Sequence, residues 1–98
     1  MTIAIKRNAQ EVVVEVAGRL DTVTAPALDK AIDENIHDIQ KLVLDLKDLE
    51  YISSAGLRVL LTAQKKMQKV GLLKLKNVRE EVMDVFEMTG FADILTIE

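Results

Sequence analysis

The sequence of 98 residues contains no cysteine and only one proline, four glycines, two phenylalanines and one tyrosine. The lack of cysteine excludes disulfides, thiol nucleophiles and cysteine-ligated metals. Because proline and glycine are scarce and no repeat or low-complexity segment occurs, we predict a single domain over residues 1–98. Since aromatic residues are few and 49% of the residues are hydrophobic, the core of this domain must be aliphatic.

Long apolar runs and an excess of positive charge are also missing. The longest apolar runs, such as 12–14 and 59–61, span only a few residues, whereas a bilayer needs about 20. Residues 1–6 lack the apolar core of a signal peptide, so we expect a cytoplasmic protein that does not bind membranes. The net charge of −3 argues against nucleic-acid binding. We also expect the protein to be a monomer.

Hydrophobic periodicity predicts a strand–helix–strand unit in the first half of the chain. Residues 3–5 alternate as in an edge strand, and the β-branched run within 11–17 is typical of a strand buried on both faces. A helix follows from Thr24, its expected N-cap, to residues 35–37. Residues 41–46 form a second buried strand, and the handedness of such connections makes it a parallel neighbour of the first.

The second half of the chain continues the alternation of helices and strands. After a crossing segment at 47–52, a long helix is expected from Ser53 or Ser54 to about Val70, with Gly71 in its C′ position. Its buried stripe has a 4-3-4-3 spacing and comprises Gly56, Leu60, Ala63, Met67 and Val70.

A short strand at 72–75 and a third helix, capped by Asn77 and ended by Gly90, complete the prediction. The order β-β-α-β-α-β-α indicates an α/β domain with a mixed sheet of four to five strands and three to four helices.

Residues suited to catalysis or metal binding are almost absent. The single histidine, His37, is expected at the end of the first helix, separated from Ser53 and Ser54 by a strand, so no serine has a base beside it. Asp45, with Asp48 and Glu50 nearby, matches no metal-binding spacing and is interpreted as surface charge at a strand end. No glycine-rich phosphate loop occurs. We therefore predict a protein that is not an enzyme and has no catalytic residue, metal or cofactor.

The segment 51–61 carries the main functional signal. One serine before an apolar-periodic helix is a normal N-cap. However, Gly56 in the first turn costs up to about 1 kcal/mol relative to alanine, which indicates that something approaches closely there. Leu57 and Leu61 lie off the buried stripe and are expected to stay partly exposed. This helix start is therefore predicted to be a docking surface.

The run Ser-Ser-Ala-Gly-Leu-Arg-Val-Leu-Leu at 53–61 resembles the signature of STAS domains of the anti-sigma factor antagonist type. Gly18-Arg19-Leu20-Asp21, followed by Thr24 and Ala25, resembles the Gly-x-Leu-Asp loop of that family. Residues 44–46 and 85–90 also fit, so that the resemblance covers essentially the whole chain. It implies a single STAS domain that works by partner switching in the regulation of transcription.

In that family, the unmodified protein binds an anti-sigma factor that is also a serine kinase, and this binding frees a sigma factor. The kinase phosphorylates a serine at the start of the second helix, and a PP2C-type phosphatase removes the phosphate. By position the resemblance implies phosphorylation of Ser54, with Ser53 as the second choice. It implies a partner-binding surface that comprises Asp21, Thr22, Ser53, Ala55, Gly56, Leu57, Arg58 and Leu61.

Other interpretations remain open from the sequence. A STAS domain also serves in partner-switching pathways or assemblies that do not end in a sigma factor. Asp21 and Thr22 also fit an ordinary strand-to-helix turn held by a local Asx hydrogen bond, and Arg58 is equally consistent with a solvated side chain. The serine pair is consistent with a cap alone, in which case Ser54→Asp leaves partner binding unchanged.

Overall fold

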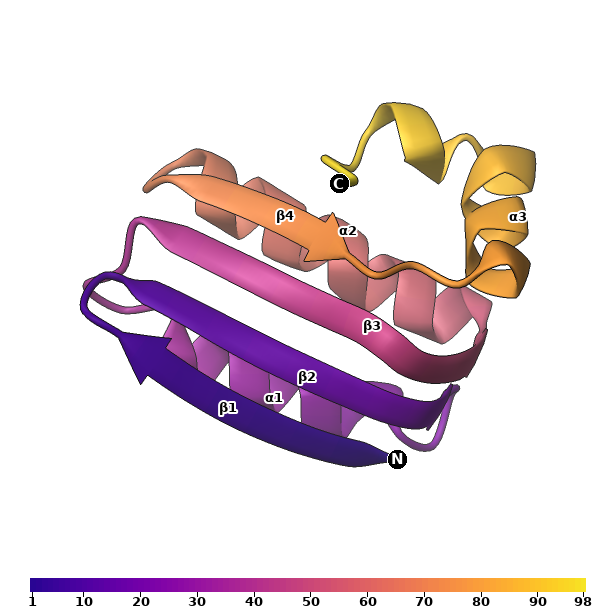
Figure 1. The fold of residues 1–98 in the computed structure, drawn as a ribbon, viewed down its shortest axis with the longest axis horizontal. Coiled ribbons are helices and arrows are strands. Elements are labelled where there is room, and N and C mark those ends of the chain that lie inside the picture. The colour runs from indigo at the N-terminus through magenta and orange to yellow at the C-terminus, as the bar shows by residue number, and fades with distance from the viewer.

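A four-stranded mixed sheet forms the centre of the fold (Figure 1). The computed structural model describes all of residues 1–98. The strand order is β1-β2-β3-β4; β1 runs antiparallel to β2, whereas β3 is parallel to both β2 and β4. The strands span Thr2–Asn8 (β1), Glu11–Leu20 (β2), Lys41–Ile52 (β3) and Leu72–Lys76 (β4). The predicted parallel pairing of the two central strands is confirmed.

Helices α1 and α2 pack side by side on one face of the sheet, and α3 lies at the carboxyl end of β3 and β4 (Figure 1). They span Ala25–Asn35 (α1), Ser54–Gln68 (α2) and Glu80–Thr89 (α3), and a short 3₁₀ helix covers Phe91–Asp93. The predicted order β-β-α-β-α-β-α is therefore confirmed. None of the helices is both long and apolar enough to cross a bilayer.

The aliphatic core lies between the sheet and the two helices that cover it. Val12, Val14 and Val16 of β2 point into this core and are buried, while Val13 on the opposite face is half-buried. The prediction that β2 is buried on both faces is wrong, because no helix covers the second face of the sheet (Figure 1). β2 therefore has the alternating pattern of a one-sided sheet.

Strand β3 is longer than predicted. Residues 47–52 do not cross the end of the strand but extend it, and Leu20 pairs with Ile52 after register shifts in the β2–β3 ladder. The buried residues Leu46, Leu49 and Ile52 recur every third position instead of every second, because the register shifts change which side chains face the core. This spacing does not signal a strand. Because of this extension, β3 ends beside the end of β2, and α2 begins there.

Three details at the ends of α2 and α3 differ from prediction. Gly71 has no left-handed φ; it is required because a Cβ there would lie 2.0 Å from the Gln40 carbonyl oxygen. Val70 is 54% exposed rather than part of the buried stripe. Asn77 does not cap α3, because the N-cap of α3 is Arg79. The side-chain amide of Asn77 instead donates to Asp45 Oδ1 at 3.1 Å.

Asp45 is also not the surface charge that the sequence suggested. It lies within β3 and is buried. Burial, the largest influence, favours the neutral acid. However, the hydrogen bonds donated by the Asn77 amide and the Lys47 N–H, together with the charges of Lys47 and Lys76, outweigh burial and lower the pKa of the Asp45 carboxyl. A long-range amide contact of this kind has no signal in the local sequence.

Candidate functional site

The starts of α1 and α2 lie at the same edge of the sheet. Strand β2 leads through residues 21–24 into α1, and β3 leads through Ser53 into α2. The two connections are joined directly, because the Ser53 N–H donates to the Leu20 carbonyl at 2.9 Å. The parallel pairing of β2 and β3 therefore brings together two sequence motifs that lie about 30 residues apart, in the way that carboxyl ends of parallel strands meet in other α/β folds.

Ser53 is the cap of α2. Its backbone is extended, and its hydroxyl oxygen accepts from the Gly56 N–H at 3.4 Å. Its carbonyl accepts from the Leu57 N–H at 2.9 Å. The expectation that one of the two serines is an N-cap is confirmed, and that serine is Ser53.

Ser54 is the first residue of α2, and its side chain is exposed. The backbone N–H groups of Ser54 and Ala55 have no intrahelical acceptor, as is normal in the first turn, and no acidic residue occupies this turn. A negative charge on Ser54 would therefore meet free donors and the positive end of the helix dipole.

Gly56 and Leu57 do not lie as the sequence suggested. A Cβ at Gly56 would lie 2.8 Å from both Ile52 Cγ1 and Leu20 Cγ. Close approach at Gly56 is therefore real, but the groups that approach belong to this chain. Leu57 is only 6% exposed, so its expected partial exposure is wrong, whereas Leu61 is half-buried as expected.

A groove of about 400 Å³ runs between α1 and α2. It begins beside the first turn of α2 and has both apolar and charged walls. Its lining residues are Thr22, Ala25, Pro26, Asp29, Ala55, Arg58, Val59 and Thr62. Two predicted contact residues of α2, Ala55 and Arg58, thus share one concave surface with Thr22 of the first loop. The sequence did not signal this groove, because it depends on how the two helices pack.

The loop before α1 is held by internal hydrogen bonds. Asp21 Oδ1 accepts from the Val23 N–H at 3.0 Å and from the Thr24 N–H at 3.1 Å. The Thr24 hydroxyl accepts from the Asp21 N–H and lies 2.8 Å from the Arg19 carbonyl, to which it donates. Thr24 is the N-cap residue of α1, as predicted, but its side chain makes no capping hydrogen bond. The Thr24 hydroxyl ties the loop together instead.

This network determines which loop residues face outward. Asp21 uses its carboxylate inside the loop, while Thr22 is exposed and Val23 is 85% exposed. Sequence reasoning missed Val23, although an apolar residue between Thr22 and Thr24 in a rigid turn is a recognisable signal. The Asx turn that the sequence left as an alternative for Asp21 is present.

The hydrogen bonds predict how the loop responds to acid. The hydrogen bonds from Thr24, most of all the one from its N–H, lower the pKa of the Asp21 carboxyl. The Val23 N–H and the charge of Arg19 lower this pKa further, and together these effects outweigh partial desolvation. A lowered pKa in the folded protein gives stability that is complete above the unfolded value of about 4 and is lost as pH falls through the folded value.

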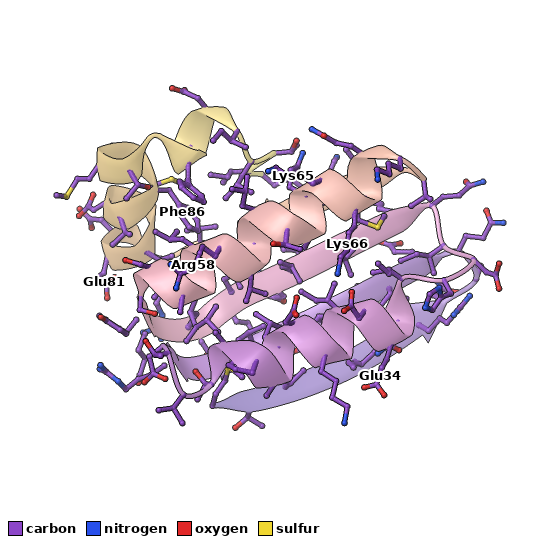
Figure 2. All side chains as sticks on the ribbon, turned by 180° about the vertical axis from the view of Figure 1, so that it is seen from behind. Glu34, Arg58, Lys65, Lys66, Glu81 and Phe86 are labelled. Carbon is purple, nitrogen blue, oxygen red and sulfur yellow. The ribbon has the colours of Figure 1, made fainter.

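We therefore expect Asp21→Ala to destabilise the protein at pH 7 and the difference from wild type to shrink below about pH 4. Urea unfolding at a series of pH values measures this difference. Glu34→Ala removes an exposed acid from the far end of α1 (Figure 2) and should follow the wild-type curve. A constant Asp21→Ala deficit down to pH 2 would contradict the role of the ionised carboxylate.

His37, which was considered as a catalytic base, lies far from this site, and the acidic residues considered for metal binding form no metal site. His37 is exposed and follows the last turn of α1, whereas Ser54 lies at the end of the sheet where α1 begins. No group of three or more histidine, aspartate or glutamate side chains is arranged to hold a metal ion. The site thus offers an exposed hydroxyl, a groove and a rigid loop.

Residues 2–98 match the family model of the STAS domain. The chain belongs to the STAS domain family. This STAS domain is 33% identical over 98 residues to the anti-sigma-B factor antagonist of Bacillus subtilis, and the alignment covers 99% of this chain and 90% of the relative.

Solved structures of other STAS proteins have the same fold. An anti-sigma factor antagonist from Mycobacterium paratuberculosis has a TM-score of 0.89 and 29% identity, covering 98% of this STAS domain and 83% of that chain. The phosphorylated form of SpoIIAA from Bacillus has a TM-score of 0.77 and 18% identity, covering 99% and 91% of the two chains. The predicted STAS fold is therefore confirmed.

Proposed function

We propose that this STAS domain is an anti-sigma factor antagonist that binds its partner through the joined starts of α1 and α2. We call this region the α1–α2 surface and define it as Thr22, Val23, Ser54, Ala55, Arg58 and Leu61. The observation that carries the proposal is the exposed Ser54 at the first position of α2, next in the chain to Ala55, which lines the groove together with Thr22 of the loop. Gly56 and Leu57 support this surface from beneath.

The names of the relatives give the proposal its partner. The Bacillus subtilis relative is an anti-sigma-B factor antagonist, and its alignment covers nearly all of both chains. An antagonist of this kind acts by occupying the anti-sigma factor, so that the sigma factor is free. Exposed Val23 and half-buried Leu61 supply apolar contacts, and Arg58 supplies a cation for a carboxylate of the partner.

We propose Ser54 as the acceptor of a regulatory phosphate. A kinase partner would transfer the γ-phosphoryl group of ATP to the Ser54 oxygen, with release of ADP and the hydroxyl proton, and a PP2C-type phosphatase would hydrolyse the ester. Ser54 is favoured over Ser53 because its side chain is exposed and makes no hydrogen bond, whereas Ser53 is half-buried and caps the helix.

The mechanism needs no change of fold. A phosphoserine carries about −1.5 to −2 charges, and the free N–H groups and dipole of the first turn stabilise it. The same charge on the α1–α2 surface would be buried when the partner binds, which costs several kcal/mol unless the partner supplies a matched cation. Phosphorylation therefore leaves the STAS domain folded and weakens its complex.

The proposal is tested by capture followed by transcription in vitro. The unphosphorylated protein is expected to capture an ATP-binding anti-sigma factor, and its addition should restore transcription that this anti-sigma factor inhibits. The variant Arg58→Glu, which reverses one charge on the α1–α2 surface, should restore it poorly. If the captured partner does not bind a sigma factor, the proposed pathway is wrong, although the binding surface would stand.

A further inference from the structure

Arg58 is a cation without a partner. It is exposed on the outward side of α2 near the start of the helix (Figure 2), and it forms no ion pair within 4.0 Å and no hydrogen bond. The nearby cations differ from it. Arg19 lies over the ring of Tyr51 at 4.2 Å, and Lys66 is paired with Asp33 of α1.

The position of Arg58 relative to Ser54 is fixed by the helix. The two residues are four positions apart on α2, and residues at this spacing are neighbours on one helix face, with Cβ atoms about 5–6 Å apart. Side chains on a helix lean toward its N-terminus. This geometry would bring the Arg58 guanidinium within reach of a phosphate on Ser54.

The other charged groups near Ser54 compete little for a phosphate. Two other arginines lie at this end of the sheet. Arg19 is held by Tyr51 and lies 4.0 Å from Asp21 Oδ2, and Arg79, the N-cap of α3, donates to the Lys47 carbonyl at 2.8 Å. The acids of the adjoining elements are Asp21, Asp29 on α1, Glu50 on β3, and Glu80 and Glu81 in the first turn of α3. These acids repel a phosphate, so that Arg58 is the cation best placed to attract it.

We infer that Arg58 is the intramolecular partner of the phosphate on Ser54. Arg58 is one of the residues that line the α1–α2 groove in the unmodified protein, and after modification its guanidinium binds the phosphate oxygens through charge-assisted hydrogen bonds. The inference rests on the proposed function, in which Ser54 carries the phosphate. It adds a second effect to phosphorylation, because the cation is withdrawn from the surface that the partner needs.

This pairing changes the character of the whole surface. Before phosphorylation, the start of α2 presents a free guanidinium and a neutral hydroxyl, a net charge of about +1. After phosphorylation, the pair carries a net charge of about −1, and the groove loses the arginine from its wall. A partner that offers a carboxylate to Arg58 meets repulsion in place of attraction.

The test uses the protein of residues 1–98 with phosphoserine incorporated genetically at position 54, which removes any need for a kinase. The ³¹P resonance of the phosphate is followed from pH 4 to pH 9, and its second pKa is read for the wild-type background, Arg58→Gln and Arg58→Lys. Exposed phosphoserine has a second pKa of about 6. A neighbouring cation lowers this value, because it favours the dianion.

We expect Arg58→Gln to raise the second pKa by about half a unit, and Arg58→Lys to raise it by less. Lys65→Gln is the matched control, since Lys65 is an exposed cation two turns farther along α2 (Figure 2), and it should leave the value unchanged. The inference is overturned if Arg58→Gln has no effect, or if Lys65→Gln has the same effect. Either outcome leaves the proposed function intact, because that is judged by partner binding.

Discussion

Phosphate on Ser54 is expected to weaken the complex with the anti-sigma factor by a hundredfold or more. The expectation follows from burying a charge of nearly −2 at the α1–α2 surface, which costs several kcal/mol, while each 1.4 kcal/mol is tenfold in affinity. Calorimetric titration of the captured anti-sigma factor with unmodified and phosphoserine-54 protein measures the ratio directly.

Two variants separate charge from loss of the hydroxyl. Ser54→Ala should bind within a fewfold of wild type, because Ser54 makes no hydrogen bond that the fold needs. Ser54→Asp should fall between wild type and the phosphorylated protein, since it carries one charge instead of nearly two. Amide spectra should show α2 unchanged in the phosphorylated form; a rearranged α2 would contradict the local mechanism, and equal affinities would remove the switch.

Replacement of Phe86 by alanine is expected to cost about 3–5 kcal/mol of folding stability. Phe86 is fully buried in the core cluster, on the side of α3 that faces the body of the protein (Figure 2). It is also the largest fully buried side chain in a core that is otherwise aliphatic. The loss would be a large part of the 5–15 kcal/mol that is typical of folded proteins.

Met88 supplies a control on the same helix. It is 86% exposed and lies two residues from Phe86, so Met88→Ala should change stability by less than about 0.5 kcal/mol. Urea unfolding of both variants at pH 7 gives the comparison. If Phe86→Ala cost as little as Met88→Ala, the packing of α3 against β3 and the core would be wrong.

Much of the fold was predictable because its patterns are local. The valine-rich β2, the apolar stripe of α2 and the left-handed Gly90 at the end of α3 each carry a signal within a few residues. The extension of β3 to Ile52 was not predictable, because it depends on register shifts in the pairing with β2. Gly71 was predicted in the C′ position of α2, but the C-cap is Lys69, so Gly71 lies one residue beyond C′ and fits against the backbone of Gln40.

The site was predictable as a segment but not as a surface. The serine pair and the small first turn of α2 identified where to look, and the cap was confirmed at Ser53. The groove, the burial of Leu57 and the exposure of Val23 depend on how α1, α2 and the loop pack together. The internal use of the Asp21 carboxylate likewise needed the position of Thr24.

One feature of the fold, the pairing of β2 with β3, explains where the site lies. Parallel pairing of β2 with β3 joins the loop before α1 to the start of α2. The joined surface has the exposed hydroxyl of Ser54 and, four residues away, Arg58, which forms no ion pair. In the proposed mechanism, a phosphate on Ser54 changes binding while the core remains as it was.

Phosphosite mapping by mass spectrometry tests the central claim most directly. The protein is isolated from its own cells, and a second sample is incubated with lysate and ATP. If Ser54 carries the regulatory phosphate, the spectra show a single phosphate on Ser54. A phosphate on Ser53 would contradict the assignment of that residue as the cap alone, and the absence of phosphate from both serines in both samples would contradict the switch.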